Sequence, residues 1–335
     1  MTVMSQRPTL RDVARQSGVS EISVSRVMRN APNISIKLRA RVEAAARELG
    51  YTPNRLAGGL KSQTSGLVAV VVPSMSNNVF PEVVDGIDRI LFLSSRRPVL
   101  GLTHYDSDRE ERIIRDLLSW SPSGIILAGL EHSDGSRRML ENANIPVIEI
   151  MDIDGTPIDT AIGISQHDAA RAMADHLVDR GYRRIGYIGA WGEAPSRSLK
   201  RRLSFEERLN ERDTPLVARL IAPEASSISV GRAACAQILA DSARLDALFF
   251  ANDDLAVGGL LHCMVSGIEV PGQLALAGFN GIDFIDAMPQ QLTTIQTPRG
   301  KMGEAAAQAL IDRSSHEARQ SIVDLGFILR ARDTT

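Results

Sequence analysis

Several side chains near the N-terminus could bind nucleic acid. Arg26 and Arg29 could donate paired hydrogen bonds to guanine or contact phosphate, and Ile22 could pack against a thymine methyl group. Phosphate would repel Glu21 unless Glu21 accepts from cytosine or pairs with an arginine, and the residue types leave both options open. The candidate DNA contacts in this segment are Thr9, Ser20, Glu21, Ile22, Ser25, Arg26 and Arg29.

The spacing around these residues predicts three short helices. Thr9 followed by Asp12 is typical of a capped helix start, and Gly18 can turn the chain after that helix. A second helix is expected over residues 21–28 and a third over 36–49. A tight glycine turn between the first two helices indicates a helix-turn-helix, whose second helix enters the major groove of DNA. The alternative is a small helical bundle that is merely basic.

Charge is distributed unevenly along the 335 residues. Residues 1–62 contain 11 Lys and Arg but 4 Asp and Glu, a net charge of +7, whereas the whole chain has a net charge of −2. The remaining residues therefore carry a net charge of −9. A basic head on an acidic body suggests that only the head meets a polyanion.

Two segments of the head resemble the lactose repressor/galactose repressor (LacI/GalR) family of transcription regulators. They are TLRDVARQSGVSEISVSRVM at 9–28 and RVEAAARELGYTPNRLA at 41–57. The resemblance implies a DNA-binding domain over 7–53 and a hinge over 54–64 that becomes helical only on operator DNA. It adds four DNA contacts in that hinge: Asn54, Arg55, Ala57 and Leu60. Of these, Leu60 is implied to wedge into a minor-groove step. Two glycines at 58–59 weaken an isolated helix by about 1 kcal/mol each, so the hinge should stay frayed without DNA.

The rest of the chain, residues 65–335, alternates β-rich runs with helical segments. Strands are expected at 67–72, 99–103, 124–128, 147–150, 185–188, 247–250 and 274–277, and helices at 108–119, 168–180 and 255–266. This alternation predicts an α/β body of parallel sheets flanked by helices, and its length predicts two lobes.

The family resemblance describes this body further. It implies that the small all-α headpiece is joined to a two-lobed, periplasmic-binding-protein-like body used for ligand binding and dimerisation. The first lobe is expected over about 65–163 and 294–320, and the second over about 164–293 and 321–335.

Polar side chains follow several predicted strands, where open α/β sheets bind their ligands. The candidates are Ser74 and Asn77, with Phe80 as a ring that could stack on a sugar, then Asn252 and Asp253, and then Asn280 and Asp283. Asn and Asp at such positions are also ordinary turn and capping residues.

Arg201 is the candidate partner for a carboxylate on the ligand. Members of the family place a basic residue three positions before a Gly-aromatic pair, and here Ser204 and Phe205 stand in place of that pair. Lys200 and Arg202 adjoin Arg201, so the register of the cation is open by one residue. An arginine can bind a carboxylate through two parallel hydrogen bonds.

Further motifs resemble the gluconate-operon repressor subgroup. They are PSMSNNVF at 73–80, LSW at 118–120, EIMD at 149–152, GFNGID at 278–283 and TPRGKMG at 297–303. The resemblance implies gluconate or a ketogluconate as effector, with Asp152 among its contacts. Residues 165–167, SQH, depart from the usual Asp-Asn, which leaves the contacts there open. His132 could bond a carboxylate or could be a solvated loop residue.

These features predict a transcription repressor that binds double-stranded operator DNA as a homodimer or tetramer. A sugar acid is expected to close the lobes and release the operator, while a corepressor role, another sugar or a nucleoside remain alternatives. Dinucleotide, P-loop and nucleophile-elbow motifs are missing, so we expect no enzyme and no cofactor. Cys235 and Cys263 are not at metal-ligand spacing, so we expect no metal.

The chain shows no export signal and no apolar stretch long enough for a membrane span. We therefore expect a cytoplasmic protein rather than a periplasmic sugar-binding protein, which would also have no use for the basic head.

Overall fold

The computed structural model describes residues 7–29, 31–52, 65–192, 197–241, 244–313 and 320–335. The chain forms two compact units that divide after Ser65. The four expected hinge contacts lie outside the described residues: Asn54, Arg55, Ala57 and Leu60. Among the helices that are described, none has the length and apolar character needed to cross a membrane.

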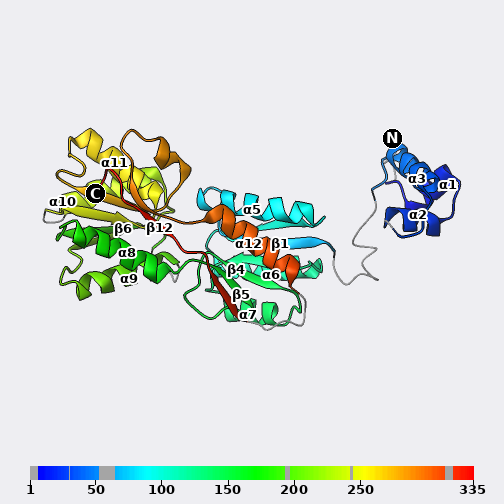
Figure 1. The fold of residues 1–335 in the computed structure, drawn as a ribbon, viewed down its shortest axis with the longest axis horizontal. Helices are drawn as coiled ribbons and strands as arrows, with labels where there is room; N and C mark the ends of the chain where they lie inside the picture. The colour runs from blue at the N-terminus through cyan, green and yellow to red at the C-terminus, as the bar shows by residue number, and fades with distance from the viewer. Residues whose placement is uncertain (1–6, 30, 53–64, 193–196, 242–243, 314–319) are drawn as a thin grey trace, which may run out of the picture. The chain divides into compact units, whose positions relative to one another are not determined.

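The first unit consists of three helices (Figure 1): α1 (Leu10–Ser17), α2 (Glu21–Met28) and α3 (Ile36–Leu49). Thr9 caps α1, because its hydroxyl oxygen accepts from the Asp12 amide at 3.3 Å and the Asp12 carboxylate accepts from the Thr9 amide at 2.9 Å. Gly18 then adopts a φ of 63° and turns the chain toward α2. Val24 and Val42 meet in the small core with no exposed surface. The predicted helix-turn-helix is confirmed.

The second unit contains two six-stranded sheets, and each defines a lobe. The sheet of lobe 1 has the order β11 (Ser321–Asp324), β5 (Thr160–Gly163), β4 (Val147–Ile150), β3 (Ile125–Ala128), β1 (Leu67–Val72) and β2 (Arg97–Leu102), with every pairing parallel. Five of the six residues of β1, LVAVVV, are buried, as expected for a strand covered on both faces.

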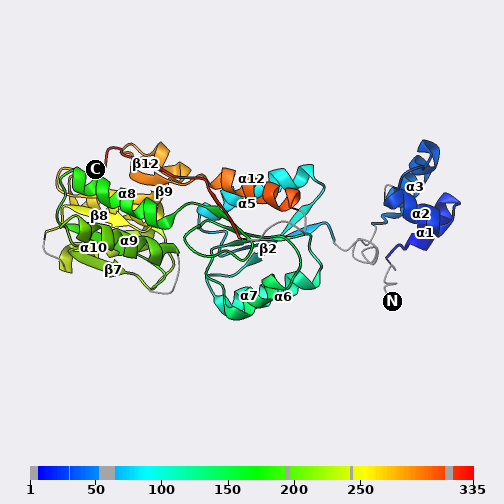
Figure 2. The same ribbon diagram turned by 60° about the horizontal axis from the view of Figure 1, so that its bottom comes forward.

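Helices cover both faces of the lobe 1 sheet. They are α5 (Val79–Leu93) and α12 (Arg299–Asp312) on one face, and α6 (Ser107–Ser119) and α7 (Asp134–Glu141) on the other (Figure 2). The α5–α12 crossing is close because it contains glycines: a Cβ at Gly303 would overlap the Val83 carbonyl oxygen. The first turn of the same helix contains Gly300, where a Cβ would meet nothing within 4 Å.

The sheet of lobe 2 is parallel except at one edge. Its order is β12 (Ile328–Arg330), β10 (Thr293–Gln296), β9 (Ala275–Asn280), β8 (Ala247–Phe250), β6 (Ile185–Gly189) and β7 (Ala218–Ile221), with β12 antiparallel to β10. Two helix pairs lie on its opposite faces (Figure 1): α8 (Gln166–Asp179) with α9 (Arg197–Glu211), and α10 (Ile228–Asp241) with α11 (Asp253–Ser266). A 3-10 helix, η1 (Asp283–Ala287), follows β9.

The chain passes between the lobes three times, and two crossings come later than we expected. The first follows β5, which pairs with β4 and β11 in lobe 1. The second lies between β10 and α12, because β10 pairs with β9 in lobe 2 instead of starting lobe 1. The third follows β11, because β11 pairs with β5 in lobe 1 instead of starting the return to lobe 2. Both strands are only four residues long, and the partner of β11, β5, is distant in sequence.

Candidate functional site

The outer face of α2 carries the predicted DNA contacts. Ile22 is 74% exposed although it is a large apolar residue, and Arg26 and Arg29 are exposed beside it. Glu21 lies 4.0 Å from the Arg11 guanidinium, so a cation of α1 offsets its charge. The exposed side chains of α2 therefore form a surface that combines apolar, cationic and acidic groups.

The hydroxyl groups near α2 have local partners. The Ser20 hydroxyl accepts from the Ser23 amide at 3.2 Å, which caps α2, and the Thr9 hydroxyl caps α1. The Ser25 carbonyl oxygen accepts from Nε of Arg29 at 3.2 Å. Thr9 and Ser20 thus position the two helices, whatever else they contact.

A cavity of about 320 Å³ lies between the two lobes of the body. It opens at the carboxyl ends of the parallel strands in both sheets, where α/β proteins bind ligands. Its lining includes Asn77, Phe80, Tyr105, Glu110 and Glu131 from lobe 1, Gln166 at the first crossing, and Trp191, Arg197, Arg201, Asn252, Phe279 and Asn280 from lobe 2.

Four residues of the cavity wall have strained backbones. Tyr105, Met151, Trp191 and Asn280 all line it and have φ values of 62°, 81°, 61° and 116°. Side chains other than glycine rarely adopt this left-handed region, and such strain gathers at ligand sites because the surrounding structure can maintain it there.

Arg201 is a buried cation in the cavity wall. Its guanidinium donates to Oε1 of Gln166 at 2.6 Å and to the Ala251 carbonyl oxygen at 3.1 Å, and it lies 4.1 Å from the ring centroid of Phe279. No carboxylate pairs with it among the described residues, and its Nε has no hydrogen-bond partner there. Burial lowers the pKa of Arg201 to about 10, so it stays protonated at neutral pH. The site can therefore accept an anion.

Arg197 adds a second cation one helical turn before Arg201. It lines the same cavity, and its guanidinium carbon is 6.0 Å from the ring centroid of Phe80 in lobe 1. The sequence reading missed Arg197, although an i, i+4 spacing on one helix face was a signal that could have found it.

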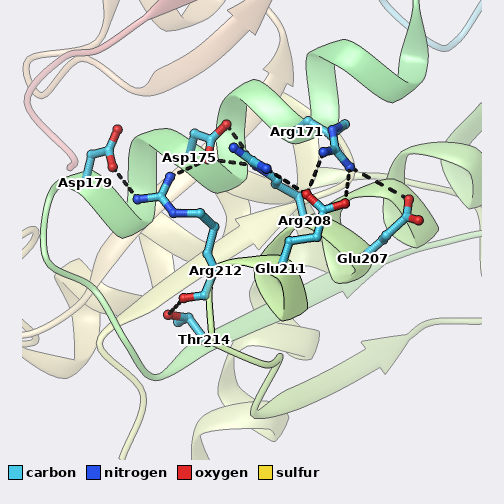
Figure 3. A network of polar contacts seen from close by, with 8 residues as sticks. All are labelled: Arg171, Asp175, Asp179, Glu207, Arg208, Glu211, Arg212 and Thr214. Atoms are coloured by element: carbon cyan, nitrogen blue, oxygen red, sulfur yellow. Dashed lines mark hydrogen bonds and ion pairs between the residues drawn. The ribbon is translucent and has the colours of Figure 1, made fainter.

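Ion pairs attach the C-terminal half of α9 to α8, which fixes how α9 presents its arginines (Figure 3). Arg208 lies 2.9 Å from Asp175, Arg171 lies 2.6 Å from Glu211, and a further contact joins Arg212 to Asp175. Hydrogen bonds from Arg171 and Arg208 lower the pKa of Glu211 to about 2.

The two neighbours of Arg201, Lys200 and Arg202, have other partners in the structure. Lys200 turns toward lobe 1, where its ammonium nitrogen lies 2.6 Å from both Glu131 and Asp152. Arg202 lies 2.9 Å from Glu206 on the same helix. Of the three cations, Arg201 is the one that lines the cavity.

Four other predicted effector contacts also line the cavity: Asn77, Phe80, Asn252 and Asn280. Asn77 donates to the Tyr105 hydroxyl at 3.0 Å, and Asn252 donates to the Ser226 hydroxyl at 2.7 Å while it caps α11. The capping interpretation of Asn252 is therefore correct, and the same residue faces the cavity.

Five predicted effector contacts are absent from the lining: Ser74, His132, Asp152, Asp253 and Asp283. Ser74 bonds the Ser76 hydroxyl at 2.8 Å, Asp152 pairs with Lys200, and Asp283 is an exposed residue at the start of η1.

The buried side chain of Asp253 shapes the loop after β9. Its carboxylate accepts from the amides of Gly281 at 2.6 Å and Ile282 at 3.0 Å, and from the Thr294 hydroxyl at 2.7 Å. Burial raises the pKa of Asp253 to about 6. The Asp253 contacts therefore hold the loop that contains Asn280. Asn280 lines the cavity, and Asp253 does not.

His132 is not the solvated loop residue that the sequence suggested as one alternative. Its side chain has no exposed surface and lies between Glu110 and Glu149. Gln166, in the segment that departs from the family pattern, reaches the cavity and bonds Arg201. Within the described residues, no group of three or more His, Cys, Asp or Glu could hold a metal ion.

Comparisons with known proteins match each of the two units to a known family. Residues 9–54 match the family described as bacterial regulatory proteins, lacI family, and residues 174–335 match the periplasmic binding protein-like domain. The HTH-type transcriptional regulator GntR of Pseudomonas aeruginosa is 39% identical over 98% of this chain and 96% of its own. This chain belongs to the lacI family.

Solved structures resemble this lacI-family regulator over nearly its full length. One is a transcriptional regulator of the LacI family from Silicibacter pomeroyi, 43% identical, with a TM-score of 0.93 and coverage of 98% of this chain and 99% of that one. Another is the lac repressor dimer bound to operator and the anti-inducer ONPF, 26% identical, with a TM-score of 0.84 and coverage of 98% and 99%. The lacI-family protein is thus a DNA-binding transcriptional regulator and not an enzyme.

Proposed function

We propose that this lacI-family regulator represses transcription as a homodimer and leaves its operator when a sugar acid, of the gluconate or ketogluconate class, binds between the lobes. The observation that carries the proposal is Arg201, a buried cation without a carboxylate partner among the described residues, in the wall of the cavity. A carboxylate on the effector would supply that partner through charge-assisted hydrogen bonds. The similarity to the relative named GntR supports an effector of this class.

The rest of the cavity suits a hydroxylated ligand. Amide groups of Asn77, Asn252 and Asn280 and the Tyr105 hydroxyl can donate to or accept from hydroxyl groups, and Phe80 offers an apolar surface. A volume of about 320 Å³ lies within the range of small-molecule sites.

Contacts that cross the cleft could link effector binding to lobe closure. The Asn78 amide donates to Asp254 at 3.0 Å, and the rings of Tyr105 and Trp191 lie 5.0 Å apart, so both pairs join lobe 1 to lobe 2. An effector that contacts both walls favours the closed state by its difference in affinity for the two states. In a dimer, closure would change the separation of the two headpieces, on which operator affinity depends.

In this proposal residues 7–53 bind the major groove through α2, and residues 54–64 form the hinge. The lac repressor dimer bound to operator, which this chain resembles over 98% of its length, supports that assignment.

A gel-shift assay across a gluconate titration tests the proposal. We expect the full-length protein to bind an operator selected from a random DNA library and to lose it as gluconate increases. Tighter operator binding with gluconate would mean that the effector is a corepressor. If neither gluconate nor 2-ketogluconate changes operator binding or raises the melting temperature, the sugar-acid proposal is wrong.

A further inference from the structure

A buried histidine in lobe 1 connects the cavity wall to the interior of the sheet. Nδ1 of His132 lies 2.8 Å from Oε1 of Glu110, and Nε2 lies 3.5 Å from Oε1 of Glu149. The other Glu149 oxygen, Oε2, accepts from the Ile158 amide at 2.6 Å. The His132 and Glu149 side chains have no exposed surface, whereas Glu110 lines the cavity.

This arrangement favours the imidazolium form of His132. Burial alone would lower the pKa of His132, but the hydrogen bond to Glu110 and the nearby charges of Glu110 and Glu149 outweigh it and raise the pKa to about 9. The cation then faces one carboxylate from α6 and one from β4. Its hydrogen bond to Oε1 fixes the position of the Glu110 side chain.

Glu110 differs from the other two acids of the cavity wall. Glu131 pairs with Lys200, and Asp106 caps α6 by accepting from the Arg109 amide at 2.8 Å. Glu110 uses Oε1 for His132, and its Oε2 makes no hydrogen bond among the residues that the structure describes. An ionised carboxylate accepts hydrogen bonds and cannot donate them, so this oxygen is suited to a hydroxyl donor.

We propose that Glu110 accepts a hydrogen bond from a hydroxyl group of the effector and that His132 is the positioning residue that orients it. The inference rests on the proposed sugar-acid function and assigns two groups of the effector to different lobes. Lobe 2 binds the carboxylate through Arg201, and lobe 1 selects for hydroxylation through Glu110. A site that is built to bond a hydroxyl rejects ligands that lack it, because its acceptor would be left buried without a donor.

The test measures selectivity in the full-length protein. Isothermal titration calorimetry compares the Kd of gluconate with those of 2-, 3-, 4-, 5- and 6-deoxygluconate for the wild type, Glu110→Gln, His132→Gln and Glu111→Gln. Glu111 is the matched control, since it is the next residue of α6 and pairs with Arg115 and Ser133 outside the cavity. The wild type should bind at least one deoxy acid about 10–100-fold more weakly than gluconate, as expected for a lost hydrogen bond to a charged group.

In Glu110→Gln the affinities for that deoxy acid and for gluconate should become similar. In His132→Gln the selectivity should fall in the same direction, and in Glu111→Gln it should stay at the wild-type value. The wild-type selectivity should also decline as the pH passes 9, while that of His132→Gln should not. Loss of the proton from Arg201 near pH 10 weakens both ligands alike, because both carry the carboxylate, so the selectivity ratio is unaffected by it.

The outcomes separate this inference from the proposed function. If the wild type binds gluconate but Glu110→Gln keeps the wild-type selectivity, Glu110 does not contact the effector and the inference is wrong. If Glu110→Gln loses selectivity and a folded His132→Gln does not, the positioning role of His132 is wrong. If the wild type binds none of these acids, the sugar-acid proposal fails, and the inference fails with it.

Discussion

The ammonium group of Lys200 in lobe 2 lies 2.6 Å from the Asp152 carboxylate in lobe 1. The same nitrogen donates to the Asp154 carbonyl oxygen at 2.9 Å. Asp152 has no exposed side-chain surface, and burial raises its pKa while the hydrogen bond from Lys200 opposes that shift. One lysine therefore compensates a buried carboxylate across the cleft, and its neighbour Arg201 remains available to the cavity.

Replacing Lys200 should weaken the junction between the lobes. We expect Lys200→Met to lower the free energy of unfolding by about 1–3 kcal/mol, because it leaves the buried Asp152 carboxylate without its cation. The double variant Lys200→Met/Asp152→Asn should recover part of this loss. Urea denaturation of the single and double variants measures the coupling, and additive effects would contradict it.

Replacing Arg201 should separate effector binding from DNA binding. We expect Arg201→Ala to weaken gluconate binding by about 10–100-fold or more, because charge-assisted hydrogen bonds to the carboxylate are lost. Operator affinity without effector should stay near the wild-type value, since the headpiece is a separate unit. Calorimetry and gel shift measure the two properties, with Arg208→Ala as the control, because Arg208 lies two turns further along α9 and does not line the cavity. Loss of operator binding in Arg201→Ala would show that its role is misassigned.

Two glycines of α12 should respond oppositely to the same change. Gly303→Ala should destabilise the body by about 1–3 kcal/mol, because its Cβ would overlap the Val83 carbonyl and force α5 away. Gly300→Ala has free space around it and should be neutral or stabilising by up to about 1 kcal/mol, since alanine favours a helix. Urea denaturation compares them, and equal effects would show that the α5–α12 approach does not limit stability.

The stability of the body should depend on His132 in the alkaline range. Its pKa is about 9 in the folded protein against 6.5 for a free histidine, so the folded state retains a proton that the unfolded chain loses. This contribution is fully present below pH 6.5 and disappears as the pH rises through 9. Urea denaturation between pH 6 and 10 should therefore show a steeper decline for the wild type than for His132→Gln. Parallel declines would mean that His132 is not charged in the fold.

Ile22 should contribute to operator affinity and not to the stability of the headpiece. Since its side chain is 74% exposed, we expect Ile22→Asp to change headpiece stability by less than about 0.5 kcal/mol. Operator binding should fall strongly, because an apolar contact is replaced by a charge that phosphate repels. Fluorescence anisotropy with a labelled operator measures the operator affinity.

The control is Val24→Ala. Because Val24 has no exposed surface, this change should lower headpiece stability by about 1–3 kcal/mol. Unchanged operator affinity in Ile22→Asp would move the DNA contacts away from this face.

Local sequence determined the headpiece and most of the framework of the body. Capping by Thr9, the left-handed turn at Gly18 and an apolar helical period act within a few residues, so the three helices could be predicted with their limits. Apolar runs such as 67–72 identify buried parallel strands for the same reason. The short strands β5, β7, β10, β11 and β12 were missed, because polar or charged residues or a glycine interrupt their few apolar residues: TAIG, ARLI, TTIQ, SIVD and ILR.

Only the tertiary structure decided which side chains reach the cavity. Lys200 and Arg201 are adjacent and both cationic, and the packing of α9 against α8 and lobe 1 places one against Asp152 and the other in the cavity wall. Gln166 reached the cavity for the same reason, while His132 was buried between carboxylates that are 39 residues apart in sequence. Side-chain direction at such sites depends on helix rotation and lobe contact, which are long-range properties that residue spacing alone does not specify.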